Sequence, residues 1–154
     1  MYMQKEKNNR LCLFVCWSLT VICMGVIFWL SSRTATESSE QSGVIVEFLR
    51  KIFGDNVFTD FIVRKSAHCL EFTGLSFLFN LSLYVTKNKP SFVFAVMLTS
   101  IYAATDEFHQ LFVEGRSCQI TDWAIDTAGA ILGALGFLVI LSIIKKLNKA
   151  SKSK

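Results

Sequence analysis

The sequence predicts an all-α membrane protein with four transmembrane helices. The chain has 154 residues, of which 52% are hydrophobic, and contains a single proline. Its mean hydropathy of +0.44 is too high for an ordinary soluble domain. Four runs approach the ~20 apolar residues that cross a hydrocarbon core of ~30 Å: about 11–30, 66–86, 92–112 and 123–144. We therefore expect one membrane domain over residues 1–154, with no appended soluble enzyme.

The basic residues predict how this domain is oriented in the membrane. Lys5, Lys7 and Arg10 precede the first run, Lys87 and Lys89 lie between the second and third runs, and five lysines follow the fourth. Cytoplasmic segments of membrane proteins carry such an excess of Lys and Arg. Both termini should therefore be cytoplasmic. The net charge of +4 is mostly this orientation signal, so we expect a lipid bilayer and no nucleic acid as partner.

The first run, residues 11–30, contains no ionisable side chain. Its basic start is typical of a signal peptide, but its apolar part is too long and Ser31-Ser32-Arg33 is a poor cleavage site. We interpret it as an uncleaved first span. Arg33 should then stand at the outer mouth of the bundle.

An outer segment, residues 31–64, should connect the first two spans. Residues 35–43 are polar and are expected to form a loop. Residues 44–53 have apolar side chains at the i, i+3, i+4, i+7 and i+8 positions of one helical face. This pattern predicts a short amphipathic helix on the outer membrane surface. A lid packed on the bundle remains an alternative. Gly54-Asp55-Asn56 should end this helix.

The second helix should begin near Thr59 or Asp60. Lys65, His68 and Glu71 follow at spacings of three residues, so they share one helical face. At 1.5 Å per residue, Glu71 lies roughly 9 Å below Lys65.

On the third helix, Asp106, His109 and Gln110 share a face by the same spacing. Glu107 should point away from Asp106, because consecutive helical residues are ~100° apart. Gly115 is the expected helix stop. Arg116 follows it in a short outer turn.

The fourth helix should begin after Thr121, which is a plausible N-cap. Asp122 and Asp126 are four residues apart and face the same way. Gly129 and Gly133 form a small-xxx-small pattern, which is typical of a helix-packing surface.

These assignments place the ionisable residues in one polar layer in the outer half of the membrane. Charged groups inside a bilayer are costly and need partners or a purpose. The deeper members come from three helices, and a ring of charges lies above them. The deeper set is His68, Glu71, Asp106, His109 and Asp126, and the ring is Arg33, Lys65, Arg116 and Asp122.

Three interpretations of the polar layer remain open. The first is structural: a closed network of ion pairs and hydrogen bonds that only holds the bundle. The second is an outward-facing pocket that binds an anionic or glycosylated envelope ligand through its Arg and Lys side chains. The third is an acid/base or metal site. Nearby cations oppose a metal ion's charge, so we assign no metal ligand. The catalytic candidates are His68, Glu71, Asp106 and His109. The ligand-binding candidates are Arg33, Lys65, Glu107, Gln110, Arg116, Asp122 and Asp126.

Three motifs follow one another along the second, third and fourth helices. They read Lys65-x-x-His68-x-x-Glu71, then Asp106-Glu107-x-His109-Gln110 with Gly115-Arg116, then Asp122-x-x-x-Asp126-Thr127-x-Gly129-x-x-x-Gly133. Their order and spacing resemble the VanZ-like family of bacterial membrane proteins, and the Ser31-Ser32 end of the first span also fits. Two positions differ from the family pattern. Glu114 replaces the usual loop proline, and Asp126 replaces the usual asparagine, which adds a carboxylate.

The resemblance implies a multi-pass protein of the bacterial cytoplasmic membrane. The member that names the family is associated with resistance to the glycopeptide teicoplanin. A cell-wall precursor, a lipid head group or a glycopeptide would then be the partner of the polar layer. No activity and no cofactor follow from the resemblance.

Overall fold

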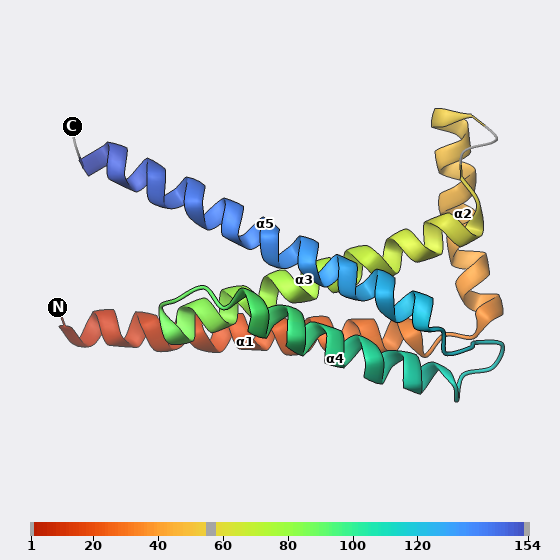
Figure 1. The fold of residues 1–154 in the computed structure, drawn as a ribbon, viewed down its shortest axis with the longest axis horizontal. Helices are drawn as coiled ribbons and strands as arrows, with labels where there is room; N and C mark the ends of the chain where they lie inside the picture. Colours follow the sequence, from red (N-terminus) through yellow and green to blue (C-terminus); the bar gives the residue numbers. More distant parts are fainter. Residues whose placement is uncertain (1, 55–57, 153–154) are drawn as a thin grey trace.

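The structure, a computed structural model, describes residues 2–54 and 58–152, which form five helices (Figure 1). Four of them run along the long axis of the molecule, and α2 crosses one end of the bundle (Figure 1). The predicted all-α class is confirmed for this part of the chain. The helices are α1 (Tyr2–Ser31), α2 (Ala35–Phe53), α3 (Asp60–Lys87), α4 (Phe92–Gln110) and α5 (Ile120–Lys152).

Three of the described helices are long and apolar enough to cross a membrane. These spans are Asn9–Ser31 in α1, Asp60–Lys87, which is the whole of α3, and Ile120–Ser151 in α5. They carry many exposed apolar side chains, which is typical of helices that face lipid. The predicted span 92–112 corresponds to α4, which does not reach the same apolarity. Its last two turns carry five polar side chains, and these lower its hydropathy. A count of four spans is therefore not confirmed.

The two ends of the bundle differ in what they carry. Both termini lie at the end opposite α2, and so does the turn between α3 and α4 (Figure 1). The three predicted basic segments thus share one end, which we call the terminal end. The other end, which we call the α2 end, carries the segments predicted to be outside.

α2 differs from its prediction. The loop expected over residues 35–43 is wrong, because these residues form the first half of the helix. Thr34 is the N-cap: its hydroxyl accepts the Glu37 N–H at 3.3 Å, and Glu37 Oε2 accepts the Thr34 N–H at 3.0 Å. This reciprocal pair is a capping box. Gly54, with φ 94°, ends the helix as predicted. Asp55 and Asn56, the rest of the predicted stop, lie outside the described residues.

Other helix boundaries are partly as predicted. α3 begins at Asp60 after the N-cap Thr59, as expected. The predicted N-cap Thr121 is wrong, because α5 already begins at Ile120 and the Gln119 carbonyl accepts the first backbone hydrogen bonds. α4 ends at Gln110, so Gly115 is not its stop. With φ 73°, Gly115 instead shapes the turn that follows.

Two kinds of packing hold the helices together. An apolar core is formed by Ile27 from α1 and by Phe72, Leu75 and Phe79 from α3, with two alanines of α4. Along the seam between α3 and α5, the backbones approach so closely that a Cβ on Gly133 would overlap the Thr73 carbonyl. A Cβ on Gly129 would meet the Cys69 carbonyl in the same way. The predicted packing surface of α5 is therefore confirmed.

Candidate functional site

The predicted polar layer gathers at the α2 end, but it separates into a hydrogen-bonded triad, an ion pair and a cavity. Ser31, Asp106 and Gln110 form the triad between α1 and α4. The Ser31 hydroxyl donates to Asp106 Oδ2 at 2.7 Å, and Gln110 Nε2 donates to Ser31 Oγ at 2.9 Å and to Asp106 Oδ2 at 3.0 Å. The three residues are 1 to 3% exposed. These hydrogen bonds join the end of α1 to the end of α4, while Asp106 Oδ1 is buried without a partner among the described residues.

Glu107 points away from Asp106, as expected, yet it is also buried, with 2% of its surface exposed. Its Oε2 accepts the backbone N–H of Gln119 at 2.9 Å. Gln119 is the last residue before α5, so this contact ties the end of α4 to the start of α5. The two adjacent carboxylates thus hold two different neighbours of α4.

His109 does not join the other predicted catalytic candidates. Its ring packs against Phe28 of α1, with 4.4 Å between the ring centroids. Neither cavity at the α2 end has His109 in its lining. His109 and His68 therefore do not line a common cavity. The spacing correctly placed His109 on the face of Asp106, because both residues contact α1.

Lys65 of α3 and Asp122 of α5 form an ion pair. Both side chains are largely buried, at 13% and 21% exposed. The pair closes one side of a small polar cavity of about 80 Å³, which Gln110, Arg116 and their neighbours also line. Lys65 is thereby engaged by a carboxylate, so it contributes to the wall of the cavity.

Arg33 stacks on Trp29, with its guanidinium carbon 4.4 Å from the ring centroid, and lies 3.7 Å from Glu37. Its backbone carbonyl accepts Arg116 Nε at 3.2 Å. The Glu114 carbonyl likewise accepts the Ala35 N–H at 3.2 Å. The loop between α4 and α5 is therefore attached to the junction of α1 and α2.

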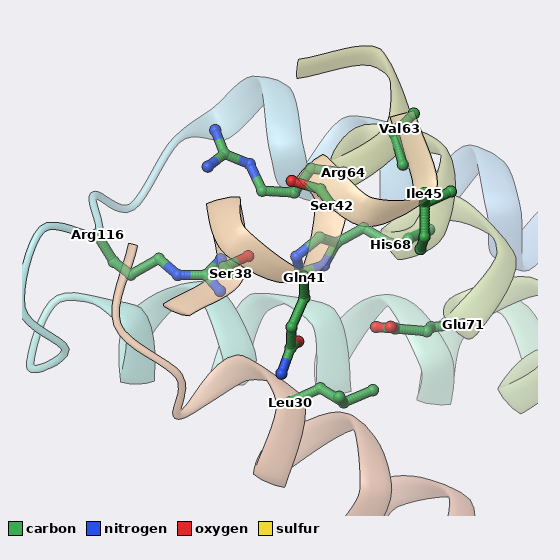
Figure 2. Close-up of a pocket in the computed structure, with 11 residues that line it drawn as sticks. Leu30, Ser38, Gln41, Ser42, Ile45, Val63, Arg64, His68, Glu71 and Arg116 are labelled. Atoms are coloured by element: carbon green, nitrogen blue, oxygen red, sulfur yellow. The ribbon is translucent and has the colours of Figure 1, made fainter. Parts of the chain in front are cut away.

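A larger cavity of about 210 Å³ lies beneath α2, and we call it the α2 cavity. Figure 2 shows the Arg116 guanidinium entering it from the loop and the Glu71 carboxylate from the opposite side, with the His68 ring between them. Of the predicted site residues, this cavity brings together His68, Glu71 and Arg116. Glu71 makes no hydrogen bond within the described residues, and His68 Nδ1 is buried there without a partner.

Sequence reasoning missed several residues of the α2 cavity. Arg64 lines both cavities, and Ser38, Gln41 and Ser42 of α2 cover the larger one. Arg64 precedes His68 by four residues and was therefore detectable from helical spacing. The α2 residues were not detectable in this way, because they belong to the predicted loop. Ser42 and Val46 are both buried, so this part of α2 packs against the bundle and covers the cavity.

Charges of both signs surround Arg116 at the α2 cavity. Burial lowers the pKa of the Arg116 guanidinium, and the neighbouring Arg64 lowers it further. The carboxylates of Asp106, Glu107 and Glu71 act on this pKa in the opposite direction. Arginine stays protonated in proteins, so a half-buried cation remains here beside a like charge. An anion bound near Arg116 would relieve that repulsion.

Asp126 lies deeper than the Lys65–Asp122 pair and is 1% exposed. Neither of its carboxylate oxygens has a hydrogen-bond partner among the described residues. It does not line either cavity at the α2 end. In the part of the chain that the structure describes, no group of three or more His, Cys, Asp or Glu side chains could hold a metal ion. The geometry thus gives no support to a metal site.

The order of these features along the chain can be compared with known families. A model of the VanZ/LLP1 family matches residues 15–142. The chain belongs to the VanZ/LLP1 family. The match runs from α1 into α5 and includes α2 and every residue that lines the α2 cavity. The predicted resemblance is therefore confirmed over a longer range than the motifs. Comparisons with curated proteins and with solved structures found no match.

The three motifs of this VanZ-family chain have distinct structural roles. The first supplies His68 and Glu71 to the α2 cavity. The second supplies Asp106 and Gln110 to the buried triad, and its Gly115-Arg116 element places a cation over the cavity. In the last motif, the glycines form the seam with α3. Only part of the family pattern therefore faces a space that a ligand could occupy.

Proposed function

We propose that this VanZ-family protein uses the α2 cavity to bind an anionic group of a cell-envelope component on the outer side of the bacterial cytoplasmic membrane. The observation that carries the proposal is the convergence of Arg116, His68 and Glu71 in one cavity covered by α2 (Figure 2). Guanidinium groups bind carboxylate and phosphate with forked hydrogen bonds. Glu71 would accept hydroxyl groups of the same ligand.

The proposed topology has four spans and both termini in the cytoplasm. The polar residues at the end of α4 are covered by α1 and by the start of α5, so α4 can cross the membrane with its neighbours. The basic residues at the terminal end favour the cytoplasm. The α2 cavity would then open outside, where cell-wall precursors, lipid head groups and glycopeptides are found.

We further propose that ligand binding at this site lowers susceptibility to glycopeptides such as teicoplanin. Membership of the family supports this link, and so does the predicted outer location of the cavity. A purely structural role is the alternative, and the hydrogen bonds of the Ser31–Asp106–Gln110 triad favour it for that part of the layer. The α2 cavity differs from the triad, because Glu71 makes no hydrogen bond among the described residues and faces a space that a ligand could occupy.

A susceptibility assay separates these two functions. The wild type and the variants His68→Ala, Glu71→Gln and Arg116→Gln are expressed in a teicoplanin-susceptible host. We expect the wild type to lower susceptibility and the three variants to return it to the level of the empty host. Lys51→Gln, at an exposed cation of α2, is the control and should behave as the wild type.

Protein amount and thermal unfolding in detergent are measured in parallel. Ligand binding is supported if the variants accumulate and unfold as the wild type does but no longer lower teicoplanin susceptibility. The structural alternative is supported if every variant that loses this effect on susceptibility also loses stability. The proposed link fails if all three variants are stable and remain as effective as the wild type.

A further inference from the structure

An apolar groove adjoins the α2 cavity. It has a volume of about 260 Å³ and lies between α2 and α3. Ile45, Val63 and Ala67 line both the groove and the cavity, so the two spaces share a wall. Leu49, Phe58, Ile62, Ser66 and Leu70 complete the groove. A space lined by charged groups and a space lined by apolar groups thus lie next to each other at the α2 end.

The groove lies on the side of the protein that faces lipid. Ile62 and Leu70 are 44% and 69% exposed, and they belong to α3, which is long and apolar enough to cross the membrane. On α2, Val44 and Phe48 are also largely exposed. An amphipathic helix with such a surface lies in the membrane interface. The groove therefore sits where the hydrocarbon chains of one leaflet begin.

The polar side of the wall fits the head of a lipid. Arg64 and Arg116 line the α2 cavity with the hydroxyl and amide groups of Ser38 and Gln41. Guanidinium groups and neutral donors together match the oxygens of a phosphate. Liquid water occupies roughly 30 Å³ per molecule, so a cavity of about 210 Å³ admits a group of several heavy atoms. Glu71, on the opposite wall, would accept a hydroxyl of the head group.

We propose that the ligand of the α2 cavity is a membrane lipid with a phosphate-bearing head group. The phosphate lies at Arg64 and Arg116, and one hydrocarbon chain lies in the groove between α2 and α3. The lipid reaches the site sideways from the bilayer. This inference rests on the proposed function, and it names the chemical class of the ligand. A soluble phosphate compound would use the cations alone and leave the groove unused.

The test uses the full-length protein in mild detergent and four probes. Native mass spectrometry measures retention of dioleoyl phosphatidylglycerol and of dioleoylglycerol, which lacks the phosphate. Thermal stabilisation measures binding of glycerol 3-phosphate, which lacks the chains, and of inorganic phosphate. We expect phosphatidylglycerol to be retained more strongly than dioleoylglycerol. It should also bind more tightly than either soluble phosphate.

Variants test which residues bind the phosphate of the lipid and which bind its hydrocarbon chain. Arg64→Gln and Arg116→Gln should each weaken phosphatidylglycerol binding roughly tenfold, the effect of losing one charge-assisted hydrogen bond. Ala67→Phe fills the shared wall and should abolish lipid retention. Leu70 lines the groove and not the α2 cavity, so Leu70→Gln should weaken lipid retention while leaving glycerol 3-phosphate binding unchanged. Ala104→Phe, at an exposed alanine of α4, is the control for Ala67→Phe. Leu70→Gln, at an exposed groove residue, provides a second test if Ala67→Phe does not fold.

The outcomes separate this inference from the proposed function. The lipid assignment is overturned if glycerol 3-phosphate binds as tightly as phosphatidylglycerol and Ala67→Phe changes the binding of neither compound. Anion binding at the α2 cavity would then still be supported. Anion recognition is overturned as well if dioleoylglycerol is retained as strongly as phosphatidylglycerol. The same holds if both arginine variants bind phosphatidylglycerol as tightly as the wild type does. The protein could instead form a dimer that binds no lipid and that Ala67→Phe dissociates. This outcome would assign the groove to a second copy of the protein and would also overturn the lipid assignment.

Discussion

The α3–α5 seam and the α2 end share α3 but are packed in opposite ways. In the seam, Gly129 and Gly133 bring the backbones into contact, and no space is left for a Cβ. At the α2 end, α3, α2 and the α4–α5 loop enclose the α2 cavity, and the start of α5 lines only the smaller cavity, through Asp122. Close packing of small residues stabilises membrane helices without a hydrophobic driving force between them. The seam thus supplies the rigidity that allows the other end to hold partly unsatisfied charges.

The largest effect should come from filling the seam. Gly133→Ala would push a methyl group into the Thr73 carbonyl, and overpacking of this kind costs roughly 1–3 kcal/mol. We expect the free energy of unfolding in mixed detergent micelles to fall by this amount, while the α2 cavity keeps its ligand. Gly136→Ala is the matched control, since a Cβ there meets no described atom within 4 Å. It should be neutral or stabilise by up to ~1 kcal/mol. Equal stability of the two variants would contradict the close approach of α3 and α5.

The second effect concerns the triad that borders the α2 end. Ser31→Ala removes the donor to Asp106 and the acceptor for Gln110, and buried groups left without partners cost ~1–3 kcal/mol. Chemical unfolding should show a loss in this range. Ser32→Ala is the control, because that hydroxyl is exposed and bonds only to the Phe28 carbonyl of its own helix. If Ser32→Ala lowers the free energy of unfolding as much as Ser31→Ala does, the triad makes no specific contribution to stability.

The smallest effect should be confined to the lid. Thr34→Ala removes the capping box of α2 and should cost ~1 kcal/mol, or about a fivefold change in local opening. Amide hydrogen exchange should accelerate at the start of α2 and stay unchanged in the α3–α5 seam. Thr36→Ala, at an exposed position in the same turn, should exchange as the wild type. Acceleration throughout the protein would show that the lid and the bundle unfold together.

The sequence predicts the class, the main helices and the seam, because each depends on local spacing. The periodic apolar runs identify the helices, and Gly129-x-x-x-Gly133 identifies a packing surface. Thr34-x-x-Glu37 also carried the signal for the start of α2, although the polar composition of residues 35–43 favoured a loop. Local patterns of this kind can be read without knowing where the neighbouring helices lie.

The site was less predictable, because it depends on how each helix is rotated. Arg64 and Lys65 are both compatible with a shared face with His68, yet Lys65 turns toward Asp122 while Arg64 lines the α2 cavity. His109 lies on the same α1-facing side of α4 as Asp106, as its spacing predicts, yet it packs on Phe28 and lines neither cavity. The burial of Glu107 depends on the path of the chain into α5, which no local pattern encodes.

The attachment of the α4–α5 loop has a consequence for release of a bound molecule. Backbone contacts join Glu114 to Ala35 and Arg116 to Arg33, and Gly115 lies against Ala35 at the first turn of α2. A Cβ on Gly115 would stand 2.9 Å from the Ala35 Cβ, so these segments are in direct contact. A movement of the first turn of α2 that broke these contacts would free the Arg116 guanidinium, while Glu71 and His68 would stay in place on α3.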